Sequence, residues 1–154
     1  MRLVRNTEDT PFKTLEVSRP WGMYGLYSLN ENCTTKILYV HNGGCLSMQY
    51  HFKRDQLYII LDDSFEIQYS TEPVPQYIQL IRDDDKRSLM MEKFLMENLK
   101  TEIVRENEAL GFRRLFVHRA RYLGPRPVGR ILDVAFGKND EEDIIRIKDD
   151  YGRA

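Results

Sequence analysis

The sequence has few of the features that mark membrane, secreted or nucleic-acid-binding proteins. Its apolar runs are all too short to span a bilayer, and its first residues, MRLVRNTEDTPFK, lack the apolar stretch of a secretory signal. The formal net charge is -1, whereas proteins that bind nucleic acids or membrane surfaces need an excess of basic residues. We therefore expect a protein that works without nucleic-acid or membrane partners.

Cysteine is also scarce. Cys33 and Cys45 are the only cysteines, and their spacing forms neither a disulfide framework nor a paired metal-binding motif. This favours a reduced, cytoplasmic protein, with a Cys33–Cys45 disulfide as the less favoured alternative. The chain of 154 residues, 42% of them hydrophobic, is long enough for a single domain with its own core, which we assign to residues 1–154.

Most of the chain reads as short strands separated by turns. Residues 34–41 and 56–61 are rich in β-branched and aromatic residues, and 64–70 alternates apolar with polar residues as a half-buried strand does. Further strands are predicted at 77–82, 101–106, 113–123 and 130–136. Turn signals such as NGG at 42–44 and GPRP at 124–127 separate these segments. Many short strands at nearly regular spacing predict an all-β antiparallel sandwich or barrel.

One segment interrupts the series of strands. Residues 84–100, DDKRSLMMEKFLMENLK, consist largely of helix formers, and acidic residues just ahead of them can cap a helix. Met91, Leu95 and Leu99 share one face of this predicted helix. We expect this inserted α-helix to pack on its own domain. The alternatives are a lid over the mouth of the barrel and a dimer contact, because methionine adapts to irregular surfaces.

Four segments carry a resemblance to a known family. They are RPWGMY (19–24), GGCLSMQYHFKRDQLYIIL (43–61), ENEALGFRRLFVHR (106–119) and EEDIIRIKDDYGR (141–153). In composition and order they resemble segments of the type II phosphomannose isomerase (mannose-6-phosphate isomerase) domain. The resemblance runs almost from end to end, interrupted by roughly 30 extra residues around the predicted helix, more than a typical connection. It implies a cupin, a jelly-roll barrel also called a double-stranded β-helix, that interconverts mannose 6-phosphate and fructose 6-phosphate.

The resemblance also implies a metal site. In the family, four ligands hold a divalent metal ion such as zinc. Two of them lie at positions i and i+2 of one strand, a third follows the next turn, and a fourth comes from a second motif. The matching positions in this chain are Gln49, His51, Gln56 and His118. The first two face the same side of a strand, here the barrel interior, because they are separated by two positions. The family has glutamate where this chain has Gln56, so all four donors are neutral, and we expect the metal to bind weakly or to be absent.

Cations near these positions are the candidate catalytic and substrate-binding residues. Proton transfer between C1 and C2 of a sugar needs a base, an electropositive group at the developing oxyanion and a cationic anchor for the phosphate. Arg54 and Arg119 match arginines of the family motifs and are predicted to bind the phosphate. Lys53 faces the same side as His51 if the strand continues, so Lys53 and Arg54 are the predicted catalytic residues, with Lys53 as base or electrophile.

Other departures from the family motifs leave the function open. The family's I-P-x-G-T-P before the second-motif histidine is FRRLFV (112–117) here. The glycine that closes the first motif is Asp63, a residue type that tolerates left-handed backbone conformations. We expect an isomerase of hexose phosphates that resembles mannose-6-phosphate isomerase. The alternatives are a non-catalytic cupin that binds a sugar phosphate or sugar nucleotide and, less favoured, a cupin of another chemistry.

Two further expectations concern assembly and activity. A homodimer is expected by analogy with the family, and because open sheets expose strand edges that pairing can cover. Larger family members carry a nucleotidyltransferase domain, whose glycine-rich motif is absent from this sequence. We therefore expect no pyrophosphorylase activity from this chain.

Overall fold

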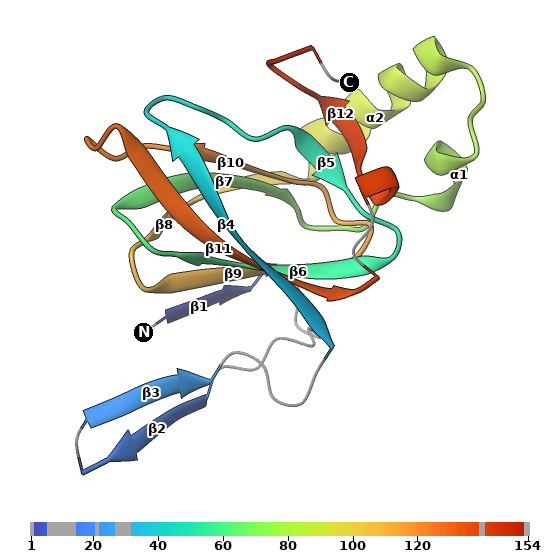
Figure 1. Ribbon diagram of the computed structural model, residues 1–154. Helices are drawn as coiled ribbons and strands as arrows, with labels where there is room; N and C mark the ends of the chain where they lie inside the picture. Colours follow the sequence, from blue (N-terminus) through green and yellow to red (C-terminus); the bar gives the residue numbers. More distant parts are fainter. Residues whose placement is uncertain (1, 6–14, 21, 27–31, 139–140, 153–154) are drawn as a thin grey trace.

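The computed structural model describes residues 2–5, 15–20, 22–26, 32–138 and 141–152, and its body consists of two facing β-sheets (Figure 1). Sheet I contains, in spatial order, β1 (Arg2–Arg5), β9 (Glu108–Phe112), β6 (Arg54–Ile60), β11 (Val128–Gly137) and β4 (Cys33–His41). Sheet II contains β12 (Ile145–Lys148), β5 (Met48–Tyr50), β10 (His118–Tyr122), β7 (Ser64–Ser70) and β8 (Leu99–Arg105). Within both sheets the described pairs are antiparallel except β1 with β9.

A separate two-stranded hairpin and three short helical elements complete the described structure. The hairpin pairs β2 (Leu15–Arg19) with β3 (Gly22–Leu26) and extends from the body of the fold in Figure 1. The helical elements are α1 (Gln76–Gln79), α2 (Asp84–Asn98) and the 3-10 helix η1 (Glu141–Asp143). In the part of the chain that the structure describes, these helices are too short or too polar to cross a bilayer.

The main core lies between the two sheets and follows the alternation read from the sequence. On β7, Phe65, Ile67 and Tyr69 are buried in this core, while the residues between them are only partly buried. The neighbouring strand β10 contributes Ala120 and Tyr122, the register partners of Ile67 and Phe65. Residues two apart on a strand face the same side, so one face of each sheet lines the interior. This interior face also carries the candidate site.

The inserted helix packs on the outer face of sheet II. Asp83 caps α2, because its carboxylate accepts a hydrogen bond of 2.8 Å from the backbone nitrogen of Lys86. Met91 and Phe94 of α2 are buried with Ile78 of α1 against the outer side of sheet II. The helix predicted over residues 84–100 is therefore present over Asp84–Asn98 and covers its own domain as expected. Leu99, predicted on its apolar face, is instead the first residue of β8.

The structure corrects two of the predicted strands. Residues 77–82 form most of α1 and the segment after it, because Pro75 precedes a helical turn in which only Ile78 is buried. The long strand predicted over 113–123 is shorter, since residues 113–117 form a turn and β10 begins at His118.

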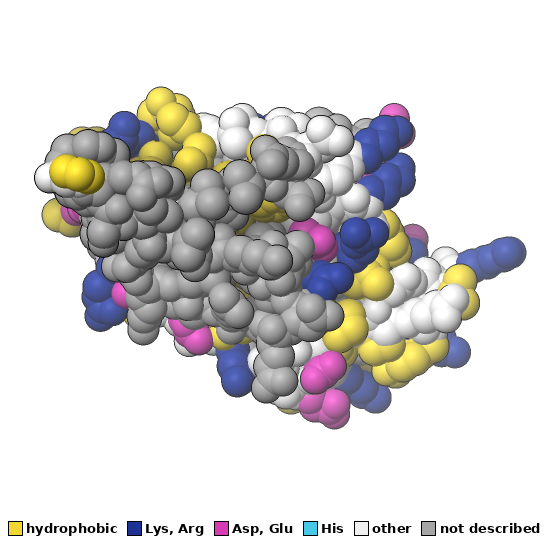
Figure 2. All heavy atoms as spheres, turned by 90° about the horizontal axis from the view of Figure 1, so that it is seen from below, with side chains coloured by type: hydrophobic (Ala, Val, Ile, Leu, Met, Phe, Trp, Pro, Cys, Tyr) yellow, Lys and Arg dark blue, Asp and Glu magenta, His cyan; other side chains and the backbone are white. Residues whose placement is uncertain are grey.

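The surface chemistry fits the small net charge. In the view of Figure 2, acidic and basic side chains are interspersed over the described part of that face. Cys33 is exposed and Cys45 is buried, and both are free thiols, as the preferred interpretation of the sequence had them. Trp21 of the resembling segment RPWGMY (19–24) lies outside the described residues.

Candidate metal- and substrate-binding site

The four side chains predicted as metal ligands converge between the sheets. His118 begins β10 and is the register partner of Gln49 on β5, while His51 directly follows β5. Gln56 comes from β6 on the opposite sheet, and its side chain interacts with that of His51. The ring centroids of His51 and His118 lie 5.3 Å apart, and Gln49 Nε2 lies 3.4 Å from His51 Nε2. The positions implied by the resemblance therefore form one cluster in space.

His118 is held with one ring nitrogen directed into the cluster. Its Nδ1 lies 3.1 Å from the carbonyl oxygen of Phe116, which can only accept, so Nδ1 carries the proton and Nε2 the lone pair. Phe112 stacks on the ring at a centroid distance of 4.5 Å. Nε2 is buried and has no hydrogen-bond partner among the described residues. A buried imidazole fixed in this tautomer is prepared to donate its lone pair to a ligand.

His51 is oriented in the same way by a segment far away in sequence. Its Nδ1 lies 3.0 Å from the carbonyl oxygen of Asp143 in η1, so Nε2 again carries the lone pair. The carboxylate of Asp143 accepts hydrogen bonds of 3.0 Å from the backbone nitrogens of both Phe52 and Lys53. Asp143 thus holds the turn between β5 and β6 and the ring of His51 together. Sequence reasoning missed this residue, although it lies in the C-terminal segment that carries part of the resemblance.

Gln56 is fixed by a carboxylate that sequence reasoning also missed. Its Nε2 donates to both oxygens of Asp133, at 3.1 and 3.2 Å, and Asp133 is only 6% exposed. The carbonyl oxygen Oε1 of Gln56 is buried and has no hydrogen-bond partner among the described residues. The signal in the sequence was an acidic residue between apolar neighbours in the strand RILDVAF (130–136).

Electrostatics keep both histidines in the form that binds metal. Burial lowers the pKa of His51 to about 4, helped by the charge of Arg54 and partly offset by Asp143. Burial also lowers the pKa of His118 to about 3, with further lowering by His51 and Arg54. Both imidazoles are therefore neutral at neutral pH.

The arrangement fits a metal ion bound by neutral donors. Two imidazoles that bind one ion through Nε2 at about 2.0–2.1 Å have ring centroids roughly 5 Å apart, close to the spacing of His51 and His118. Gln56 Oε1 is a third available donor. Gln49 would join after its amide rotates, because its Oε1 now accepts a 2.6 Å hydrogen bond from Ser47. Within the described residues, no group of three or more His, Cys, Asp or Glu side chains is placed to hold a metal. The donor set thus depends on amide oxygens.

Of the two predicted catalytic residues, Arg54 is buried at the site and Lys53 is exposed. Arg54 is buried at the start of β6, on the same face as Gln56, and its charge acts on both histidines. Lys53 is exposed, because β5 ends at Tyr50 and the strand does not continue through position 53. The condition under which Lys53 would face the site is therefore not met.

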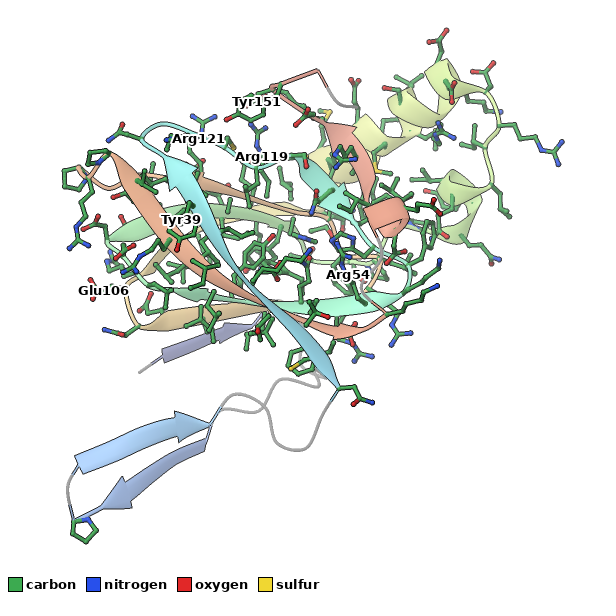
Figure 3. The ribbon with its side chains drawn as sticks, in the orientation of Figure 1. Tyr39, Arg54, Glu106, Arg119, Arg121 and Tyr151 are labelled. Carbon is green, nitrogen blue, oxygen red and sulfur yellow. The ribbon has the colours of Figure 1, made fainter. Side chains whose placement is uncertain are left out.

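Arg119 lies on the other face of sheet II from the histidines. It follows His118 directly on β10, and adjacent residues of a strand point to opposite sides. Arg119 Nε donates to Cys45 Sγ at 2.6 Å, and its guanidinium forms an ion pair with Asp150. Figure 3 shows Arg119 well separated from Arg54. The structure therefore does not bring the two predicted phosphate-binding arginines together.

The turn before His118 keeps an unusual backbone conformation. Leu115 has φ 70°, and in the resembling segment it stands where the family has glycine. A side chain in this left-handed region costs about 1–2 kcal/mol. The strain is offset locally, because Leu115 N donates to the carbonyl oxygen of His51 at 2.7 Å, which ties the two histidine segments together. Asp63, at the other lost glycine, likewise has φ 52°.

Comparison with known proteins finds similarity to the same family that the sequence motifs resemble. Residues 6–80 match the family described as "Mannose-6-phosphate isomerase C-terminal". The chain is 28% identical over 141 residues to the alginate biosynthesis protein AlgA of Pseudomonas syringae pv. tomato, covering 91% of this chain. It is 27% identical over 139 residues to the xanthan biosynthesis protein XanB of Xanthomonas campestris pv. campestris, covering 90% of this chain. The chain thus resembles the phosphomannose isomerase cupin domain, with the family match over residues 6–80 and 27–28% identity to these relatives. It spans 23% and 24% of the length of these two relatives.

Solved structures agree on the fold of this cupin domain. The capsular polysaccharide assembling protein CapF of Staphylococcus aureus superposes with a TM-score of 0.54 at 10% identity, covering 89% of this chain and 33% of that one. Recombinant oxalate oxidase superposes with a TM-score of 0.52 at 11% identity, covering 75% and 46% of the two chains. The predicted all-β cupin jelly roll with an inserted helix is therefore confirmed.

Proposed function

We propose that this cupin domain binds a phosphorylated hexose between its sheets and interconverts mannose 6-phosphate and fructose 6-phosphate with a divalent metal ion. One observation carries the proposal: the lone pairs of His51 and His118 and the free carbonyl oxygen of Gln56 converge beside the buried cation of Arg54. The relation to the phosphomannose isomerase cupin domain supports the choice of substrate. The names of the relatives, which concern alginate and xanthan biosynthesis, agree with a role in sugar metabolism.

Each residue of the site would have a distinct role in this reaction. His51, His118 and Gln56, with Gln49 after its amide rotates, would hold the metal ion, which supplies Lewis acidity at the sugar carbonyl. Arg54 places a positive charge in the same buried space, where it stabilises negative charge that develops on the sugar oxygens. Lys53 is exposed, so a role as the base requires it to reach the sugar from the solvent side.

The test combines metal analysis of the purified protein with a coupled assay of mannose 6-phosphate isomerisation. We expect turnover to depend on added divalent metal and to fall about 100-fold in Arg54→Gln, since one preorganised electrostatic contact typically contributes that much. Arg82→Gln, which changes an exposed arginine, is the matched control and should keep full activity. Lys53→Ala decides the role of Lys53, because unchanged activity would exclude it. A metal-loaded protein without turnover would refute the isomerase proposal.

A second candidate, a non-catalytic cupin that binds sugar phosphates, is favoured by two observations. Gln56 stands where the family has glutamate, and Lys53 points out to solvent. The two candidates differ in a thermal-shift experiment with metal-free protein. Stabilisation by mannose 6-phosphate or fructose 6-phosphate, without stabilisation by mannose or inorganic phosphate and without turnover, would favour the binder.

A further inference from the structure

We propose that Asp133 is a positioning residue that fixes the side-chain amide of Gln56, so that the carbonyl oxygen and not the NH₂ group faces the two histidines. The site can then accept a divalent cation although the ligand position lacks a carboxylate. The cation part of this inference rests on the proposed function, whereas the orientation of Gln56 does not.

The argument starts from the chemistry of the two side chains. An ionised carboxylate can only accept hydrogen bonds, and both oxygens of Asp133 lie within 3.1 and 3.2 Å of Gln56 Nε2. The flipped amide would place Gln56 Oε1 against the carboxylate, where two acceptors repel each other. Because the amide group is planar, directing Nε2 toward Asp133 turns Oε1 away from it.

The strand register places Asp133 for this role. Ala135 of β11 is the register partner of Gln56, so Asp133 lies two residues along the same face of β11. On the other side, Asp133 is the register partner of Lys36 on β4. Asp133 is buried among these strands, which restricts the positions that its carboxylate can take.

The state of Gln56 Oε1 is the second observation. This oxygen is buried and has no hydrogen-bond partner among the described residues, although buried polar atoms are normally paired. His118 Nε2 is in the same state. Unpaired acceptors from two strands on facing sheets are what a bound cation would satisfy. Two imidazole nitrogens and a neutral oxygen suit borderline ions such as Zn²⁺ or Co²⁺.

Asp133 therefore supplies part of the negative charge of the family glutamate, but it contacts Gln56 and not the cation itself. A carboxylate at position 56 would contact the cation directly. Here Gln56 stands between the carboxylate of Asp133 and the site, and its hydrogen bonds to Asp133 polarise its carbonyl oxygen.

A double-mutant cycle in metal-free, sugar-free protein tests the orientation. Asp133→Asn should lower the urea midpoint of the wild-type protein, because it weakens the hydrogen bonds to Gln56. In the Gln56→Glu background the same substitution should raise the midpoint, because it removes a carboxylate facing Glu and supplies an amide donor. Asp62→Asn is the control, since Asp62 is buried but bonds to Arg130, and its effect should be the same in both backgrounds. If Asp133→Asn lowers the midpoint equally in both backgrounds, the orientation proposal is overturned.

Co²⁺ binding, followed by its visible absorption, tests the cation. We expect Asp133→Asn to weaken binding about 10–100-fold, as is usual for residues that orient a ligand. Gln56→Glu combined with Asp133→Asn should bind at least as tightly as wild type. Absence of Co²⁺ binding in both wild type and the double variant overturns the cation part. A reversed sign in the urea cycle without isomerase turnover would keep the role of Asp133 and reject the proposed function. Turnover without sign reversal would reject only the role of Asp133.

Discussion

The two buried histidines predict how the stability of the metal-free protein depends on pH. Burial lowers the pKa of His51 to about 4 and that of His118 to about 3, from 6.5 in the unfolded chain. A histidine whose pKa is lowered by folding is neutral in both the folded and the unfolded chain above pH 6.5, so it does not reduce the stability there. Below that pH the unfolded chain takes up a proton that the folded protein does not, so stability falls as the pH is lowered.

The magnitude follows from the size of the shift. Each unit of pKa difference corresponds to about 1.4 kcal/mol, so His51 alone removes about 3 kcal/mol of stability between pH 6.5 and pH 4. Protonation linked to His118 lowers the free energy of unfolding over the same range and continues to lower it to about pH 3. The free energy of unfolding of a domain is about 5–15 kcal/mol, so these two residues can decide whether the protein stays folded.

Urea unfolding at a series of pH values between 7 and 4, in the presence of a chelator, measures this dependence. His118→Gln should reduce the slope by about half, because one of the two buried histidines that cause it is removed. Asp62 does not interfere in this range: hydrogen bonds from Arg130 lower its pKa from 3.8, so its contribution is lost only at lower pH. A stability that stays flat from pH 7 to pH 5, or equal slopes in wild type and His118→Gln, would refute the buried, neutral state of the pair.

Two further substitutions test the supports of the site. Asp143→Ala should lower the free energy of unfolding in urea by about 3 kcal/mol and reduce hexose-phosphate affinity, because two backbone N–H groups lose their acceptor. Glu92→Ala on α2 is the control. An unchanged urea midpoint in Asp143→Ala would contradict the role of Asp143. Arg119→Gln should cost about 1–3 kcal/mol, since its partner Asp150 is partly exposed, and should leave the thermal shift with mannose 6-phosphate unchanged. A loss of that shift as large as in Arg54→Gln would return Arg119 to the binding site.

The sequence predicted well wherever alternation and burial coincide. The strand at 64–70 and the helix beginning at residue 84 have the predicted type because one face of each is buried. The prediction failed at 77–82, where a short apolar alternation proved to be a helical turn after Pro75. It also failed at 113–117, because the left-handed conformation of Leu115 leaves no mark in the residue types. Periodicity reports which face is buried and does not report the path of a turn.

The same alternation could have separated the two arginines in advance. The reasoning that put Gln49 and His51 on one face of a strand also requires His118 and Arg119, which are adjacent, to face opposite sides. The family resemblance assigned a role to Arg119 without applying this rule. Asp133 and Asp143 could not be found in this way, because their roles depend on contacts between residues far apart in sequence.

The C-terminal segment links the resemblance to the site in physical terms. Its first part holds the turn that carries His51 through Asp143, and its last part holds β10, which carries His118, through Asp150 and Arg119. Backbone carbonyls of Asp143 and Phe116 therefore hold the Nδ1 atoms of the two imidazoles, and the C-terminal segment holds the strands that carry them. Such a site can keep the geometry of its histidines when a neutral amide replaces a carboxylate at position 56, so under the proposed function the metal affinity would change without a change of fold.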